Sequence, residues 1–413
     1  MTFWNRFGLD RFIVVRNCLI IFYLVSVLFG FSLHVYDRTK KRLVASKLIT
    51  VYSFALAIIP CLFYKIANQL LTLEGERKSI VASVIDTIES LLLIQSLIFG
   101  TLRRFRTWKE TAEIFEEIHA IANGLGYPLR TVVYVVMKRM LKKMVISFTL
   151  LIVPVASIAM QKFQIEQVPI DWIALLVTMY PKVMIVNATG LFYGQVMFIG
   201  RFFEILNQKL GTLHQEVSRE LAIISFGKSS NLYTEKLRQI VILRERVYIL
   251  AQRLNKAYSY QMLIIFTLIS ILILNQFYFL STVVNRYARY SVDVSSRLSV
   301  AVLFMCILNF HEAYKVADVC EQAIEESRAT ADILHKFNAL NINPELKKNI
   351  EMFLIQLLHH PLKFTACGMF SLDYTIVASV MSYLIILVQF EVADNCGQDS
   401  RNQVTAAGSM DLW

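Results

Sequence analysis

Few residues in this chain have the types and spacing that catalysis needs. His311 is followed by Glu312, but no second histidine follows one helical turn later, as a zinc-binding helix would require. His359 and His360 are adjacent and would face different sides of a helix. Cys367 has no base at a readable spacing, and no glycine-rich loop is present to hold a phosphate. The sequence therefore predicts that the protein is not an enzyme, and it predicts no metal and no cofactor.

Three ionisable residues inside apolar segments are more informative. Asp86 and Glu89 are three residues apart and share one helix face, and Lys182 directly follows Pro181 in another apolar segment. A charge at the centre of a bilayer costs at least about 2.5–3.5 kcal/mol, so each of these residues needs a partner, a cavity or a ligand. Counted from the predicted outer helix ends, Glu89 and Lys182 both lie about 15 Å deep. They are predicted either to pair across two helices or to line a ligand pocket.

The candidate pocket lies in the outer halves of the apolar segments. Carboxylates and amides there could hold hydroxyl groups while aromatic rings supply an apolar face. Each aromatic residue could instead belong to the core or to the interfacial belt. The candidate ligand-binding residues are Asp86, Glu89, Trp172, Thr178, Tyr180, Lys182, Gln276 and Tyr278.

The elements that position these residues are predicted to be membrane spans. The 413-residue chain is 56% hydrophobic and only 18% charged, with a mean hydropathy of +0.52, whereas soluble proteins have roughly 25% charged residues. The net charge of +11 is spread between apolar runs, which argues against a nucleic-acid partner. The six cysteines stand singly, so we expect free or buried thiols and no disulfide framework.

The distribution of basic residues predicts the topology. If the first apolar segment re-enters without crossing and the next seven cross, 33 of the 42 Lys and Arg residues face the cytoplasm and 8 face outside, as the positive-inside rule requires. The fold class is therefore all-α, a polytopic membrane protein with an N-terminal re-entrant segment, seven spans, a cytoplasmic N-terminus and an extracellular C-terminus. The eight apolar segments are 12–35, 48–64, 79–102, 144–161, 172–200, 257–285, 298–311 and 374–390.

The same assignment divides the chain into regions. Residues 1–47 form the N-terminal region with the re-entrant segment, 48–200 the first four spans and much of the pocket, 201–256 cytoplasmic helices, 257–311 spans five and six, 312–373 cytoplasmic anchor helices, 374–390 span seven, and 391–413 an extracellular tail.

Two cytoplasmic helices are predicted from apolar spacing. One carries a seam with alternating spacings of three and four residues, and the other begins at Asn343-Pro344-Glu345, a capping residue followed by proline and an acid. Both are expected to bury their apolar stripes, either within the chain or between copies of it. The seam is Ile240, Leu243, Val247, Leu250 and Leu254; the second stripe is Leu346, Ile350, Phe353 and Leu357.

The last apolar segment ends with the residues Ser382-Tyr383-Leu384-Ile385-Ile386-Leu387-Val388-Gln389-Phe390. This order of Ser-Tyr, five apolar residues and Gln-Phe resembles the C-terminal signature of the insect gustatory receptor family, which usually has threonine at the position of Ser382. The resemblance extends over the chain in span order and loop sizes. It implies a homotetramer, or a heteromer with related receptors, in which span seven lines a central pore and a small tastant binds in the outer-half cavity.

Within that resemblance, the end of span seven is predicted to contain the gate. Tyr383, Ile386 and Phe390 share a helix face, and a ring of Phe390 side chains would close the pore by dewetting. Gln389 points about 100° away and could replace Phe390 when the helix turns. Beyond it, Glu391 and Asp394 would form a negative ring that concentrates cations at the outer mouth.

The resemblance thus implies a ligand-gated non-selective cation channel acting as a taste receptor in the plasma membrane of sensory neurons. Its partners would be a tastant, permeating cations and membrane lipids. The stretch 384–388 lacks the acid that the sugar-receptor branch commonly carries, which leaves fructose-type, bitter or other ligands open. A metabotropic seven-span receptor would need the opposite charge bias, and a transporter would be expected to show internal repeats.

Overall fold

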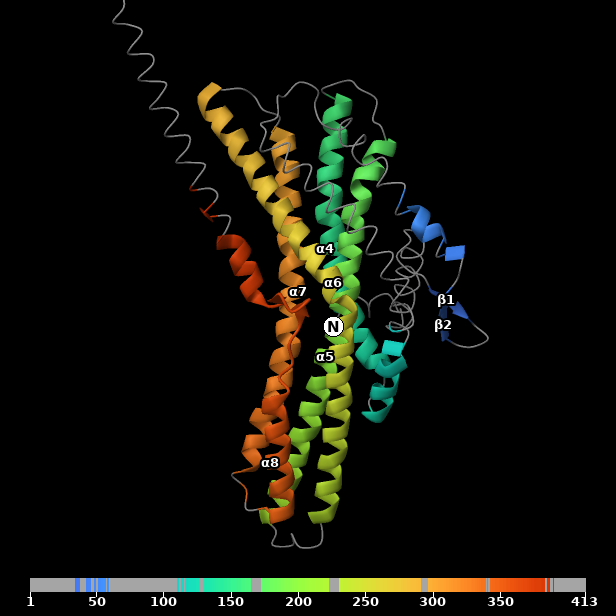
Figure 1. The fold of residues 1–413 in the computed structure, drawn as a ribbon, viewed down its shortest axis with the longest axis vertical. Coiled ribbons are helices and arrows are strands. Elements are labelled where there is room, and N and C mark those ends of the chain that lie inside the picture. The colour runs from blue at the N-terminus through green and yellow to red at the C-terminus, as the bar shows by residue number, and fades with distance from the viewer. Residues whose placement is uncertain are drawn as a thin grey trace, which may run out of the picture.

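Long helices dominate the structure, a computed structural model (Figure 1). The predicted re-entrant segment up to residue 33, the predicted second span 79–102 and the tail 391–413 lie outside the described residues. Described are residues 34–37, 42–45, 48–49, 51–56, 58, 110, 113–114, 116–126, 129–164, 172–222, 230–290, 296–338, 340, 342–382, 385–386 and 389.

Four helices form the bundle: α4 (Leu129–Gln164), α5 (Trp172–Ala222), α6 (Ser230–Tyr290) and α7 (Ser296–Phe337). Each contains a stretch long and apolar enough to cross a membrane, and these stretches overlap the predicted spans three to six. Helical structure also covers 51–56 in the first predicted span and 374–382 at the start of the seventh. The prediction of a helical polytopic membrane protein is therefore confirmed, while the count of seven spans and the orientation stay predictions.

The helices continue well past the predicted membrane boundaries. α5 has 51 residues and α6 has 61, which at 1.5 Å per residue gives lengths of about 77 and 92 Å. The hydrocarbon core of a bilayer is only about 30 Å thick. The C-terminal halves of α5 and α7 and the N-terminal half of α6 make up this extra length. They run side by side toward the end of the bundle where α8 lies (Figure 1).

The predicted seam on α6 is buried inside the chain. Val247, Leu250 and Leu254 have almost no exposed surface, and Ile240 is also buried in the same hydrophobic cluster as the far half of α5. Leu243 is half-buried and packs against that cluster. Of the two expectations, packing within the chain or between copies, the seam shows the first.

Helix α8 (Pro344–His359) begins and packs as predicted. The side chain of Asn343 accepts a hydrogen bond of 3.1 Å from the backbone N–H of Glu345, and Pro344 occupies the first helical position. The predicted stripe is the buried face of α8. One member, Phe353, lies against the buried guanidinium of Arg244, 5.9 Å from its ring centroid.

Two small hairpins depart from the purely helical prediction. β1 (His34–Asp37) pairs antiparallel with β2 (Arg42–Ala45), and β3 (Thr365–Ala366) pairs with β4 (Phe370–Ser371). The second turn is tight because Cys367 and Gly368 both adopt positive φ angles, 53° and 73°, which glycine tolerates without cost. These two short hairpins are the exceptions in a described structure that is otherwise helical, as predicted.

The β3–β4 hairpin connects α8 to the last helix and is fixed to α6. The backbone N–H of Thr365 donates a 3.0 Å hydrogen bond to the side-chain oxygen of Asn255. Next to the hairpin, Phe364 is fully buried and meets the ring of Phe192 edge-on, with centroids 6.4 Å apart. The start of the last helix therefore has a defined position relative to α5 and α6.

Candidate functional site

The predicted pore helix begins at a capped end. The carboxylate of Asp373 accepts hydrogen bonds from the backbone N–H of Thr375 at 2.9 Å and from the Thr375 hydroxyl, which is the geometry of a helix N-cap. Ser371 donates to the same carboxylate at 2.6 Å. Partial burial acts to raise the pKa of Asp373, but the hydrogen bonds from Ser371 and Thr375 outweigh it and hold the pKa below its ordinary value.

The first turn of this helix is attached to α7. The hydroxyl of Tyr374 donates a 2.9 Å hydrogen bond to Asp318, and its ring stacks on Tyr314 with centroids 5.8 Å apart. Asp318 also accepts hydrogen bonds from Lys315 at 3.0 Å and from Gln322 at 2.9 Å. The acceptor is thus held in place by α7 itself, so that the contact fixes the helix start.

The family signature is only partly within the described residues. The Ser382 hydroxyl donates a 3.0 Å hydrogen bond to the carbonyl of Ala378, one turn earlier in the same helix. Ile385, Ile386 and Gln389 are exposed on the surface of the single chain. The remaining pore and outer-mouth candidates, Tyr383, Phe390, Glu391 and Asp394, lie outside the described residues.

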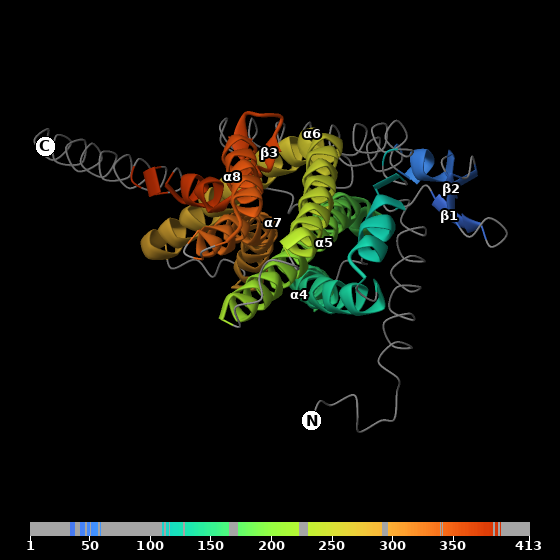
Figure 2. The same cartoon turned by 90° about the horizontal axis from the view of Figure 1, so that it is seen from below.

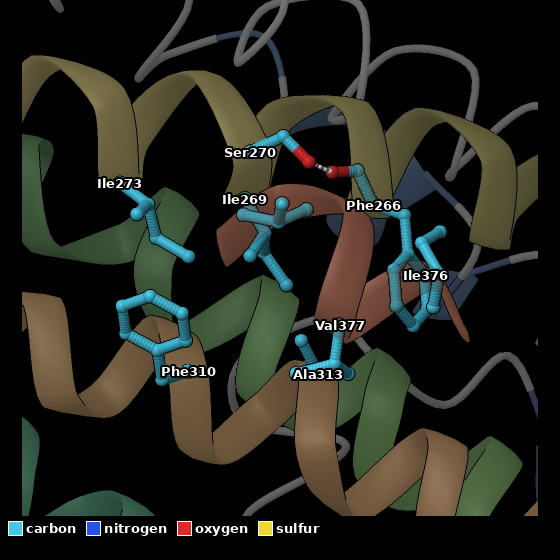
Figure 3. A pocket seen from close by; sticks show the side chains of 9 residues that line it. Phe266, Ile269, Ser270, Ile273, Phe310, Ala313, Ile376 and Val377 are labelled. Carbon is cyan, nitrogen blue, oxygen red and sulfur yellow. Dashed lines mark hydrogen bonds between the residues drawn. The ribbon is translucent and has the colours of Figure 1, made fainter. Parts of the chain in front are cut away.

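Behind the first turns of the last helix lies an apolar cleft (Figure 3). Its lining comes from α6, α7 and the helix 374–382. Ser270 is the one polar side chain in this lining, and its hydroxyl donates to the carbonyl of Phe266 at 2.8 Å. The cleft therefore offers no free polar group between the last helix and α6 and α7. The lining residues are Phe266, Ile269, Ser270, Ile273, Phe310, Ala313, Ile376, Val377 and Val380.

Few residues of the predicted ligand pocket have described side chains. Asp86 and Glu89 lie outside the described residues, as do the side chains of Trp172 and Thr178 in α5. Tyr180 and Lys182 on α5 are half-buried, as is Tyr278 on α6. The Glu89–Lys182 pair, and a pocket that unites the candidates, stay predictions.

One pocket candidate has a defined partner. Gln276 on α6 accepts a 3.2 Å hydrogen bond from the side-chain amide of Asn309 on α7. Amide pairs of this kind join neighbouring helices where water is scarce. Gln276 therefore holds α6 against α7, a role that does not require a ligand.

A buried ionic cluster joins α4, α5 and α7, and the sequence analysis missed it. Lys143 on α4 is 2% exposed and Glu312 on α7 is 1% exposed, and the two form a salt bridge. Thr189 on α5 and Ser147 on α4 both donate to the Glu312 carboxylate, Ser147 at 2.5 Å. Thr189 also accepts from the Lys143 ammonium at 2.9 Å. Because the charges are paired and hydrogen-bonded, their burial is tolerated.

A sequence signal for this cluster existed in the predicted span ends. Lys143 directly precedes the apolar segment 144–161, and Glu312 directly follows 298–311. Both predicted spans therefore end at the same level, on the side predicted to be cytoplasmic, where opposite charges can meet. Thr189 lies 17 residues from the start of α5 at Trp172, about 26 Å along the helix, within the predicted apolar segment 172–200.

Two glycines allow α4 to approach α5 closely at this level. Gly190 and Gly194 are four residues apart, the small-xxx-small spacing of packed membrane helices. A Cβ atom at Gly190 would lie 2.7 Å from the sulfur of Met144, and one at Gly194 would lie 3.0 Å from the sulfur of Met140. Only a residue without a side chain fits at these positions while both methionines stay in place.

Among the described residues, no three His, Cys, Asp or Glu side chains gather as a metal site would require. The described cysteines Cys306, Cys320 and Cys367 are free thiols, in agreement with the expectation for these three.

Comparison with known families and curated proteins gives consistent matches. The family described as "7tm Chemosensory receptor" matches residues 19–394. The gustatory receptor for bitter taste 22e of Drosophila melanogaster is 27% identical over 210 residues, which cover 48% of this chain and 49% of that relative. The gustatory receptor for sugar taste 43a of the same species is 33% identical over 98 residues, 23% of each chain. The chain thus matches half or less of the length of these relatives.

A solved structure shares the fold over nearly the whole chain. The insect olfactory receptor OR5 from Machilis hrabei superposes with a TM-score of 0.62, covering 92% of this chain and all of that chain, at 16% sequence identity. The likeness shows that the arrangement of long helices is a known one.

Proposed function

The chain belongs to the 7tm chemosensory receptor family, and from this premise we propose that it is a ligand-gated cation channel of the gustatory type. One observation carries the proposal. The apolar helix that ends in the family signature is attached to α7 at Tyr374, yet exposes Ile385, Ile386 and Gln389 on a single chain. An exposed amide on an apolar helix is costly in lipid but is satisfied when it faces a water-filled pore.

The ligand is proposed to be a small organic molecule. The Machilis hrabei receptor OR5 has also been solved in complex with eugenol, and it superposes on this chain with a TM-score of 0.62. The outer-half residues Asp86, Glu89, Tyr180 and Lys182, with the aromatic Trp172, would line the pocket here. Ligand binding opens the channel by stabilising the open state more than the closed one.

A bitter compound is the first ligand class to test. Two relatives named for bitter taste, 22e and 66a, match over 210 and 198 residues, whereas the relative named for sugar taste, 43a, matches over 98. An acidic pair such as Asp86 and Glu89 suits a cationic alkaloid, although it also suits a polyol. A calcium-imaging panel of alkaloids and sugars, with fructose included, separates the two classes.

Assembly into a tetramer is proposed to use α8. Its outer face exposes three apolar residues, Met352 (50%), Ile355 (56%) and Leu358 (79%), in a region assigned to the cytoplasm, where lipid cannot cover them. Burial of this stripe against other copies would place four pore helices around one axis. Leu358→Glu should shift the purified protein to smaller assemblies by mass photometry, whereas Lys347→Glu on an exposed part of the same helix should not.

The decisive experiment records current from purified protein in a planar bilayer without G protein. A ligand identified by calcium imaging should evoke cation current there, because the pore and the binding site are in the same protein. A ligand that binds the purified protein and evokes no conductance would reject the channel. It would favour a metabotropic receptor, the alternative that the charge distribution argues against. The proposed location is the plasma membrane of sensory neurons.

A further inference from the structure

We propose that the outward face of α4 binds the anionic headgroups of phospholipids in the cytoplasmic leaflet. Lys138, Arg139 and Lys142 are exposed and form no ion pair within the described part of the chain. Lys138 and Lys142 are four residues apart and share one side of the helix, with Arg139 beside them. They form an unpaired cationic surface, named here the α4 basic patch.

The α4 basic patch is the lower end of a stripe that faces outward. Leu141 and Val145 lie on the same side as Lys138 and Lys142, and both are exposed, as is Ile152 two turns higher. Along this stripe the residues change from apolar to cationic. Such a change matches a bilayer, in which acyl chains give way to phosphate-bearing headgroups.

The depth of the α4 basic patch fits the headgroup layer. The apolar segment of α4 begins at residue 144, so the Cα atoms of Lys142 and Lys138 lie about 3 and 9 Å below it. A headgroup layer is roughly 5–8 Å thick on each side of the core. The neighbouring Lys143–Glu312 pair supports this level independently, because Glu312 directly follows the apolar segment 298–311 of α7.

A second copy of the chain is a poorer occupant of this face. α4 contains no Asp or Glu over its 36 residues, so two α4 faces brought together would oppose cations with cations. α4 also lies at the edge of the bundle, beside α5 and α7 and away from α8 (Figure 2). Anionic lipid supplies the complementary charge, and juxtamembrane basic clusters bind it through each Lys or Arg near the surface.

Binding can be measured by native mass spectrometry on the full-length protein. The protein is held in neutral phosphatidylcholine nanodiscs, to which phosphatidylserine or phosphatidylinositol 4-phosphate is added in increasing amounts. It is then released in the mass spectrometer, and the bound lipid is counted. The test variant is Lys138→Gln with Arg139→Gln and Lys142→Gln. The matched control is Arg238→Gln with Lys347→Gln and Lys348→Gln, which removes the same charge from exposed positions on the distant cytoplasmic helices. Symmetric nanodiscs make the result independent of the proposed orientation and of channel activity.

The test variant should bind anionic lipid on the order of 100-fold more weakly, since each of three cations contributes about a factor of five. The control should retain the affinity of the wild type, and 10 mM inorganic phosphate should not displace the lipid, because the apolar part of the stripe holds the acyl chains. Unchanged binding in the test variant, an equal loss in the control, or displacement by free phosphate would each overturn the proposal.

Discussion

The hydroxyl of Tyr374 donates a 2.9 Å hydrogen bond to Asp318, and this bond ties the first turn of the last helix to α7. Together with the ring stack on Tyr314, it fixes one end of a helix whose far end carries the exposed signature residues. A helix held at one end moves most at the other. Opening is therefore expected to displace the region of Gln389 more than the region of Tyr374.

Tyr374→Phe keeps the ring and removes the hydrogen bond. A bond to a charged, partly exposed acceptor contributes about 1 kcal/mol, so we expect the ligand concentration for half-maximal current to rise about fivefold at unchanged surface expression. The reason is that the first turn of the last helix, once it is no longer bonded to Asp318, absorbs part of the ligand-driven motion. Ser379→Ala, which removes only a bond within the helix, is the control. Equal responses of both variants would show that the inner end is not a pivot.

Asp373→Ala removes the N-cap and should destabilise the last helix by about 1 kcal/mol, whereas Asp373→Asn keeps the capping oxygen and should cost a few tenths. Because the pKa of Asp373 is lowered in the folded protein, its charged form adds stability above the pKa of the unfolded chain. That stability is lost as the pH falls through the pKa that Asp373 has in the folded protein. The melting-temperature difference between wild type and Asp373→Asn should therefore be constant from pH 5 to 8, and a difference that grows across this range would contradict the assignment.

Lys143→Met leaves Glu312 buried without its counter-ion and should destabilise the fold by about 3–5 kcal/mol. Fluorescence-detected gel filtration after heating measures the loss in neutral detergent. Lys142→Met, one residue away but exposed, should melt like the wild type. The double variant Lys143→Met with Glu312→Gln should recover much of the loss. If Lys143→Met melts like Lys142→Met, the buried pair does not hold these helices together.

Gly190→Val should separate α4 from α5, because its Cβ would lie 2.7 Å from the Met144 sulfur. Overpacking of this kind costs about 1–3 kcal/mol. Met144→Ala in the same protein should restore part of the stability by making room. Gly211→Ala lies on the same helix with nothing within 4 Å of the new Cβ, and it should melt at or above the wild-type temperature. The measurement is the melting temperature of the wild type, Gly190→Val, the double variant with Met144→Ala, and Gly211→Ala. Equal melting temperatures of Gly190→Val and the wild type would contradict the close approach of α4 and α5.

Phe390→Ala should give current without ligand, since a smaller side chain widens the proposed hydrophobic constriction and lets it wet. Surface biotinylation confirms that the variant reaches the membrane. The matched control is Met381→Ala, on an exposed part of the same helix nearer its start. Silence of Phe390→Ala at the surface would place the gate elsewhere.

The sequence predicted those parts of the fold that depend on local spacing. The α8 cap at Asn343 and the buried seam around Val247 follow from residue patterns within one helix, and both were right. The β3–β4 hairpin was missed because it depends on two consecutive positive φ angles at Cys367 and Gly368, which leave little trace in an apolar pattern.

The Lys143–Glu312 pair was missed for a different reason. Its two residues are 169 positions apart, and they become neighbours only once α4 and α7 are aligned at their inner ends. Lys182 was noticed instead because its own surroundings in the sequence are apolar. Charges that end two different spans require the helices to be placed side by side before their attraction can be seen.

The uninterrupted course of α6 from Ser230 to Tyr290 has a mechanical consequence. A rod of about 92 Å that tilts by about 3° displaces its tip by roughly 5 Å. The tilt needs no local unfolding, because the interior hydrogen bonds of the rod stay intact. A displacement imposed at one end of α6, by a neighbouring subunit or a bound protein, would therefore be carried along the continuous helix to its other end.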